Sequence, residues 1–140
     1  MSKTSVRLLL ALSVSLAGCS RQMADAPTPG AAEDSGKLMG ARLYDANCAA
    51  CHQQDARGIP GVYPTLVGST VVLGDPKELT LWVMKGQRPA SMPGGRYPTR
   101  MPDYAWMKPA AAAALFNYLR SNFGNAAPRV DAAALARALE

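Results

Sequence analysis

Apolar residues recur at helical spacing in three stretches of this chain of 140 residues. In such a pattern every third or fourth residue faces the same side, so each stretch can bury one face against a neighbour. In the first stretch, the inner face is drawn from Leu38, Ala41 and either Leu43 or Tyr44. The pattern therefore predicts three helices, over residues 37–51, 76–85 and 109–123.

Residues typical of helix ends mark the limits of the second and third helices. Asp75 and Pro76 suit the N-cap and the first helical position, and Gly86 suits the position after the last turn. Pro109 and Gly124 suit the same roles in the third helix. The prolines and glycines between the helices predict loops.

Residues 128–140 form an alanine-rich extension after the third helix. Leu135 and Leu139 are four residues apart, which indicates a helix over 130–140. We expect this helix to pack on the outside of the domain or to fray.

The N-terminal residues have the pattern of an export signal. Lys3 and Arg7 precede an apolar run from Leu8 to Leu16, which is too short to span a bilayer as a stable helix. The run ends in Leu-Ala-Gly followed by Cys19, which resembles the lipobox of bacterial lipoproteins. The resemblance implies that residues 1–18 are a signal peptide and that Cys19 carries lipid. Ordinary signal cleavage near Gly18 is the alternative.

Residues 19–36 have almost none of the large apolar side chains that a core requires. We therefore expect the lipidated Cys19 to be followed by a flexible linker, with a folded domain over 37–127. Without Lys3 and Arg7, the formal net charge falls from +5 to +3, which is mildly basic. This charge excludes the dense basic surface of a nucleic-acid-binding protein.

The chemistry of the chain is concentrated in one motif, Cys48-Ala-Ala-Cys51-His52. This C-x-x-C-H spacing is typical of covalent haem c attachment, because two thiols on one turn can bond the porphyrin edge while the histidine binds the iron. A thioredoxin-type pair would require a βαβ pattern around it, which is absent. A zinc site would require four ligands, whereas only two cysteines and one histidine remain once Cys19 is assigned to the lipid.

The second iron ligand cannot be a histidine of this chain, since His52 is the only one. A methionine thioether is the best remaining ligand, and it raises the reduction potential. Met39 and Met84 lie in predicted helices, where we expect them to fill the core. Met92 and Met101, both in loops and both followed by proline, remain as candidates.

Several features together resemble class I cytochromes c, an all-α fold wrapped around one haem. They are C-x-x-C-H, the P-x-L-x-G segment that begins at Pro64, the pairing of Gly40 with Leu115 and Tyr118, and the ending from Met101 to Asn125. The segment from Tyr44 to about Ala127 is most similar to the cytochrome subunits of membrane-bound bacterial dehydrogenases. Two departures from this pattern are Ala56, where glycine is usual, and Lys108-Pro109 in place of a Ser-Asp cap.

This resemblance implies specific roles for residues of the site. The first and last core helices would cross at Gly40, and the Pro64 carbonyl would accept a hydrogen bond from His52. Met101 would be the second iron ligand. The cofactor would be one covalent haem c, bound by Cys48, Cys51, His52, Pro64 and Met101.

The expected function is single-electron transfer and not enzymatic catalysis, because both axial positions of the iron would be filled. The partners would be a dehydrogenase-type donor and a respiratory acceptor, with the protein lipid-anchored on the periplasmic side of a bacterial membrane. A haem enzyme or sensor with a labile sixth ligand, such as a peroxidase-like site, is the alternative. A positive ring around the methionine loop would steer an acidic partner; its candidate members are Lys85, Arg88, Arg96, Arg100 and Lys108.

Overall fold

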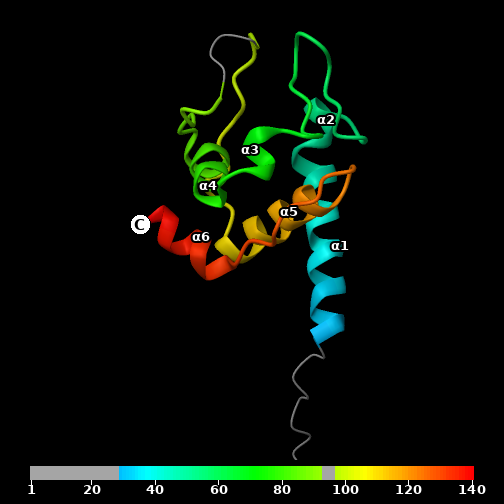
Figure 1. Cartoon of the computed structure of the whole chain (residues 1–140), viewed down its shortest axis with the longest axis vertical. Coiled ribbons are helices and arrows are strands. Elements are labelled where there is room, and N and C mark those ends of the chain that lie inside the picture. Colours follow the sequence, from blue (N-terminus) through cyan, green and yellow to red (C-terminus); the bar gives the residue numbers. More distant parts are fainter. Residues whose placement is uncertain (1–28, 93–96) are drawn as a thin grey trace, which may run out of the picture.

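A computed structural model describes residues 29–92 and 97–140 of the chain. Its elements are α1 (Pro29–Asn47), α2 (Ala49–His52), α3 (Thr70–Leu73), α4 (Pro76–Lys85), α5 (Pro109–Ser121) and α6 (Ala132–Leu139) (Figure 1). Within these residues the only β-type pairing is an isolated bridge between Ile59 and Tyr63. The prediction of an all-α fold is confirmed. No helix in the described part of the chain is long and apolar enough to cross a bilayer.

Helices α1 and α5 make the most extensive contact of any two elements, and Figure 1 shows α5 lying across α1. Gly40 lies at the closest approach. A Cβ atom added there would clash with the Ala114 carbonyl oxygen and would lie 2.6 Å from Cβ of Tyr118. The predicted pairing of Gly40 with the last core helix is therefore confirmed, because only a residue without a side chain fits.

The buried face of α1 differs in part from the predicted one. Tyr44 is buried at 2% exposure, but Leu38 is 62% exposed and Met39 is 47% exposed. The predictions of Leu38 as an inner-face residue and of Met39 as core filler are therefore wrong. Gly40, Tyr44 and Cys48 face inward instead, at steps of four residues, because close contact with α5 selects the face that carries glycine.

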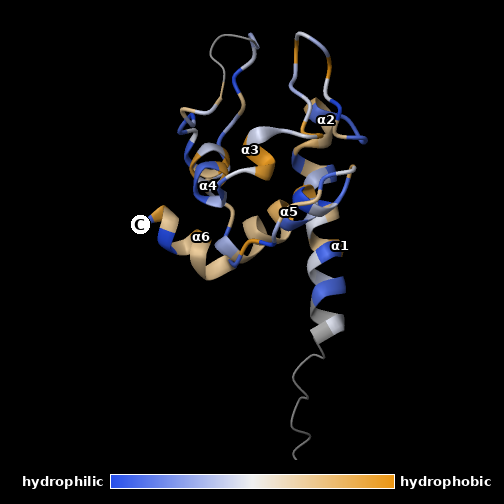
Figure 2. Cartoon of the chain, viewed as in Figure 1, coloured by the Kyte–Doolittle hydropathy of each residue, from blue (hydrophilic) through white to orange (hydrophobic). Residues whose placement is uncertain are grey.

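Helix α1 begins at Pro29, whereas the composition indicated a flexible linker through Gly36. Residues 29–36 are therefore helical. Proline is favoured at the first position of a helix, and this segment contains the good helix formers alanine and glutamate. Figure 2 shows hydrophilic residues along much of the N-terminal half of α1, whereas α3 is mostly hydrophobic. Of the residues in these first turns, Glu33, Asp34 and Ser35 are exposed.

Helix α4 has the predicted limits. The Asp75 carboxylate accepts a hydrogen bond from the Lys77 N–H at 2.8 Å, Pro76 occupies the first helical position, and Gly86 ends the helix at φ 65°. Helix α5 begins at Pro109 as predicted but ends at Ser121, before Phe123. The Asn122 side chain donates to the Tyr118 carbonyl oxygen at 2.8 Å, and so satisfies a carbonyl of the last turn in place of the backbone.

The C-terminal helix α6 is part of the folded core. It packs against both α4 and α5, and Leu135 is only 1% exposed. Asn117 of α5 binds the backbone of Val130 twice, accepting from its N–H at 2.6 Å and donating to its carbonyl at 3.0 Å. Fraying, one of the two predicted outcomes for this extension, is therefore not what the structure shows.

Arg120 of α5 connects α6 to the rest of the domain. Its side chain is 3% exposed and is bound by backbone carbonyls. Nε donates to Pro128 O at 2.8 Å, and Nη1 donates to Val72 O at 2.6 Å and Gly74 O at 3.0 Å. One guanidinium thus joins α3, the residue that directly follows it and the segment that leads to α6.

Candidate functional site

The Cys48–His52 motif lies on one helical turn directly after α1. The Cys48 N–H donates to Tyr44 O at 2.8 Å, and the His52 N–H donates to Cys48 O at 2.8 Å. Cys48 is buried, Cys51 is partly buried, and neither forms a disulfide. The two thiols and the imidazole are therefore held on a single rigid turn, which is the arrangement that attachment at two points of a porphyrin edge requires.

Burial, followed by the charge of a Cys51 thiolate, raises the pKa of Cys48 to about 11. Cysteines of redox-active C-x-x-C pairs have lowered pKa values, because the thiolate is the reactive form. The Cys48 thiol is therefore protonated at neutral pH. This environment argues against a thioredoxin-type role for the motif.

The His52 ring is buried at 6% exposure and is fixed by one hydrogen bond. Its Nδ1 lies 2.9 Å from the carbonyl oxygen of Pro64. A carbonyl can only accept, so Nδ1 carries the proton and Nε2 keeps a lone pair. Burial lowers the pKa of His52, an effect that the Pro64 carbonyl opposes. The resulting neutral imidazole, with Nε2 open, is the metal-binding form.

The hydrogen bond between His52 and Pro64 is the contact that the family resemblance implied. Gly58, in the intervening loop, helps to hold it in place in two ways. Its N–H donates to His52 O at 2.9 Å. Its backbone also packs closely on Pro64, since an added Cβ atom would lie 2.5 Å from Pro64 O. The tight return of the chain at Gly58 therefore brings Pro64 to the imidazole.

Asn125, which sequence reasoning did not assign to the site, anchors the segment that follows Pro64. It is 6% exposed, and its Oδ1 accepts from the Gly68 N–H at 2.8 Å. Its Nδ2 donates to Leu66 O at 3.2 Å and to Leu119 O at 2.8 Å. The end of α5 thus fixes the P-x-L-x-G segment. The signal available in the sequence was the polar residue directly after the turn glycine Gly124.

Tyr44 and Tyr104 also support the attachment turn through their hydroxyl groups. Tyr44 donates to Gln53 O at 2.5 Å, and Tyr104 donates to Asn47 O at 2.7 Å. Burial, and then the charges of Cys48 and Cys51, raise the pKa of Tyr104. The phenol therefore stays protonated and keeps its donor role.

Met84 was predicted to lie in the core, and Met92 and Met101 in loops, and the structure places them so. Met39 is the exception. Met84 and Met107 are each 2% exposed and belong to the core. Met92 and Met101 are partly buried and pack against that core from the loop between α4 and α5. Among the described residues these two are therefore the loop thioethers available to a ligand, and the choice of Met101 stays a prediction.

Several predicted features lie outside the described residues. They are the signal segment, Cys19 and Arg96. The other cations predicted around the methionine loop are exposed, as is the acid Asp103; they are Lys85, Arg88, Arg100 and Lys108.

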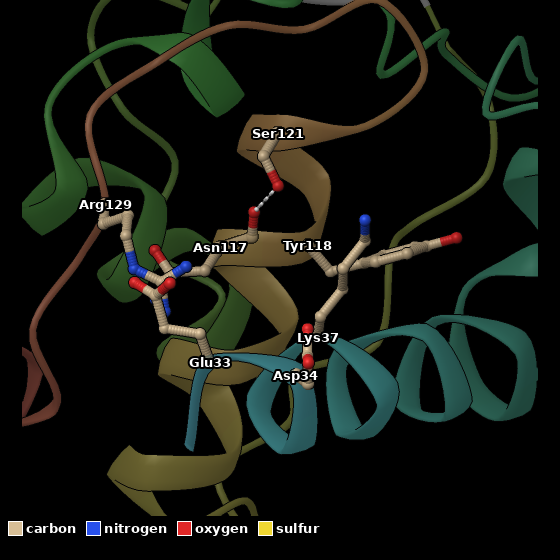
Figure 3. Close-up of a pocket in the computed structure, with 7 residues that line it drawn as sticks. All are labelled: Glu33, Asp34, Lys37, Asn117, Tyr118, Ser121 and Arg129. Atoms are coloured by element: carbon tan, nitrogen blue, oxygen red, sulfur yellow. Dashed lines mark hydrogen bonds between the residues drawn. The ribbon is translucent and has the colours of Figure 1, made fainter. Parts of the chain in front are cut away.

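A polar hollow lies between the N-terminal part of α1 and the C-terminal part of α5 (Figure 3). Its lining includes Glu33, Lys37 and Arg129, and the Ser121 hydroxyl donates to Asn117 O at 2.8 Å beside it. None of the lining residues belongs to the Cys48–His52 motif, and of its supporting residues only Tyr44 is contacted, by the Tyr118 ring with centroids 5.9 Å apart. The hollow is therefore separate from the candidate site.

Comparison with known proteins agrees with this geometry. The family model for cytochrome c matches residues 38–123. Cytochrome c-552 of Thermus thermophilus is 35% identical over 92 residues, which cover 62% of this chain and 70% of that protein. The fructose dehydrogenase cytochrome subunit of Gluconobacter japonicus is 36% identical over 102 residues, which cover 69% of this chain and 21% of that subunit.

A third relative is the cytochrome c subunit of a quinone alcohol dehydrogenase from Gluconobacter oxydans. It is 32% identical over 91 residues, which cover 64% of this chain and 19% of the subunit. The chain therefore spans about a fifth of the length of the dehydrogenase subunits that it matches.

Proposed function

The chain belongs to the cytochrome c family, and from this premise we propose that it is a single-haem electron carrier with His52 and Met101 as the iron ligands. Members of this family carry covalent haem c and transfer electrons, and the protein is an electron carrier and not an enzyme. The observation that carries the proposed ligation is the 2.9 Å contact between His52 Nδ1 and the Pro64 carbonyl, on the turn that also holds two free cysteines.

The residues present fit haem c. Cys48 and Cys51 would hold the porphyrin covalently, and His52 would bind the iron through Nε2. When bound, haem c supplies an iron that gains or loses one electron. The Pro64 carbonyl orients the imidazole and raises its basicity, which strengthens the bond that a metal makes at Nε2. His52 is 6% exposed, so little water reaches the ring.

Met101 is the proposed second ligand because it is a loop thioether that packs against the core. It also begins a segment fixed close to the attachment turn, since the Tyr104 N–H donates to Val83 O at 2.9 Å and the Tyr104 hydroxyl binds Asn47 O. Met92 has a similar burial, but its N–H donates to Pro89 O of its own loop at 3.1 Å.

We propose that a dehydrogenase-type protein donates the electron and a respiratory protein accepts it. The names of two relatives, which are cytochrome subunits of dehydrogenases, support this assignment. The export-like N-terminus and Cys19 support a lipid anchor on the periplasmic side of a membrane. Replacing Cys19 by serine should move the protein from the membrane fraction to the soluble periplasmic fraction, and a variant that still sediments with membranes would count against the anchor.

The ligand assignment is tested by comparing Met101→Ala with Met92→Ala in the haem-loaded protein. Met101→Ala should abolish the weak red absorption band of iron–methionine bonding and lower the reduction potential, while the haem stays covalently attached. Met92→Ala should leave both unchanged. Loss of the band in Met92→Ala alone would reverse the assignment, and a high-spin ferric spectrum in the wild-type protein would contradict bonding by either methionine.

A further inference from the structure

Trp106 is the most exposed large apolar side chain among the described residues, at 66% exposure. Tryptophan is usually largely buried, and at protein surfaces it is enriched among the residues that dominate binding. Two of its neighbours are held in the fold, since Met107 is 2% exposed and Tyr104 is partly buried, whereas Ala105 is exposed. Trp106 thus points outward from a short turn that is anchored in the core on both sides.

This turn is fixed by three hydrogen bonds. The Met107 N–H donates to Tyr104 O at 2.9 Å and closes the turn, and the Tyr104 N–H donates to Val83 O of α4 at 2.9 Å. The Tyr104 hydroxyl donates to Asn47 O at 2.7 Å. The Trp106 ring also packs edge-on against the Tyr104 ring, with centroids 6.3 Å apart. A side chain held in this way loses little conformational entropy when it is buried by a partner.

The same contacts connect Trp106 to the attachment turn. Tyr104 contacts the Trp106 ring on one side and binds the carbonyl of Asn47 on the other, and Asn47 is bonded directly to Cys48. A protein bound over Trp106 would therefore contact a short, hydrogen-bonded route to one of the two cysteines proposed to hold the haem.

Exposed cations accompany the indole. Arg100 and Lys108 precede and follow it in the sequence, and Asp103 is the one acid in residues 97–108. The Arg100 guanidinium approaches the end of α4, since its Nη2 lies 3.8 Å from the position of a Cβ atom on Gly86, next to the exposed Lys85. An apolar centre with a basic rim is the arrangement of a protein-binding surface.

We propose that Trp106 is the central contact of a docking surface for a redox protein whose matching surface is an apolar depression bordered by carboxylates. This inference rests on the proposed electron-transfer function and adds the chemistry of the partner. The indole fills the depression, while Arg100 and Lys108 face the carboxylates and orient the encounter. The single electron that the partner gains is the one that the haem iron loses, so no other reactant is needed.

The test uses stopped-flow electron transfer from the reduced, haem-loaded protein. A panel of purified bacterial oxidases with carboxylate-bordered electron-entry sites is screened first. The oxidase that the wild-type protein reduces fastest is then used as the probe. Trp106→Ala should lower the second-order rate by about tenfold or more, because truncation of a central tryptophan removes much of the binding energy. Trp106→Phe should retain most of the rate. Leu38→Ala, which truncates a side chain of similar exposure on α1, should leave it unchanged.

Equal rates for Trp106→Ala and the wild-type protein would overturn this docking role. A Trp106→Ala variant with an altered absorption spectrum or potential would also overturn it, because the indole would then act on the haem and not on the partner. Oxidation by ferricyanide, which needs no docking surface, separates this inference from the proposed function. If ferricyanide oxidises Trp106→Ala normally and its rate with the oxidase is also unaffected, only the proposed Trp106 surface is contradicted. If ferricyanide cannot oxidise the wild-type protein, electron transfer itself is contradicted.

Discussion

Two residues that closely follow His52 hold backbone conformations that side chains rarely adopt. Gln53 has φ 62° and Ala56 has φ 60°. Such a conformation costs about 1–2 kcal/mol for a residue other than glycine. The Tyr44 hydroxyl binds the carbonyl of Gln53, and the carbonyl of Ala56 accepts from the Leu66 N–H at 2.8 Å. Hydrogen bonds to distant residues therefore offset local strain in the loop that brings Pro64 to His52.

The sequence identified Ala56 as unusual, because related cytochromes have glycine at this position. The reason is visible only in the structure. A left-handed backbone suits glycine, and here an alanine with no exposed surface accepts it. No local pattern predicts this conformation, because the bonds that enforce it come from residues up to ten positions away.

At the residue scale, Gly58→Ala should weaken the bond between His52 and Pro64. Gly58 has φ 66°, and an added Cβ atom would lie 2.5 Å from Pro64 O and 2.7 Å from Pro64 C. The variant should therefore lose stability by about 2–4 kcal/mol, from backbone strain together with the clash. Chemical denaturation measures this loss, and the NMR signal of the His52 Nδ1 proton reports the hydrogen bond.

The matched control for this change is Gly61→Ala. Gly61 also has a positive φ, of 76°, but no atom lies within 4 Å of an added Cβ atom. Its cost should be only the conformational strain of about 1–2 kcal/mol, with an unchanged histidine signal. Similar losses for both variants, with the histidine signal unchanged in each, would show that Gly58 does not position Pro64.

At the scale of elements, the crossing of α1 and α5 depends on a single missing side chain. Gly40→Ala raises intrinsic helix propensity by about 1 kcal/mol. It also forces a methyl group against the Ala114 carbonyl and to within 2.6 Å of Cβ of Tyr118, so the helices must separate. We expect a net loss of stability of about 2 kcal/mol, measured by chemical denaturation.

Gly36→Ala provides the comparison within the same helix. No atom lies within 4 Å of its added Cβ atom, so only the propensity gain applies, and the variant should be more stable by about 0.5–1 kcal/mol. Stabilisation by both alanines would contradict the close packing of α5 on Gly40.

Local signals predicted the helices whose ends are determined locally. Asp75, Pro76 and Gly86 fix α4 through their own caps, and the sequence pattern placed its limits correctly. The end of α5 and the buried face of α1 were predicted less well. The Asn122 side chain ends α5, and the contact at Gly40 sets the buried face of α1. Neither feature appears in the periodic pattern of apolar residues.

At the scale of the whole molecule, residues far apart in the sequence complete the site. The motif predicts the turn that holds Cys48, Cys51 and His52, because its spacing is local. Asn125 binds Leu66 across 59 positions and Tyr104 binds Asn47 across 57. Side chain to backbone bonds over such separations leave no local pattern in a single sequence, so the partners of these two residues could not be predicted.

The stability of the whole domain should depend on α6. Leu135→Ala removes a side chain that is 1% exposed between α6 and its neighbours, and it should cost about 2–5 kcal/mol through lost burial and the cavity that remains. Leu139→Ala, on the same helix but only partly buried, should cost about 1 kcal/mol. Thermal or chemical unfolding of the haem-loaded protein measures both, and equal small losses would mean that α6 is peripheral to the domain.

The carbonyl oxygens that hold Arg120 come from residues 72, 74 and 128, on both sides of it in the sequence. During synthesis or export the N-terminal end appears first, so the arginine emerges before Pro128 can bind its Nε. Until then Nε would be buried without an acceptor, which disfavours the closed core. We therefore expect closure to wait for the segment that leads to α6, which leaves Cys48 and Cys51 accessible for haem attachment in the meantime.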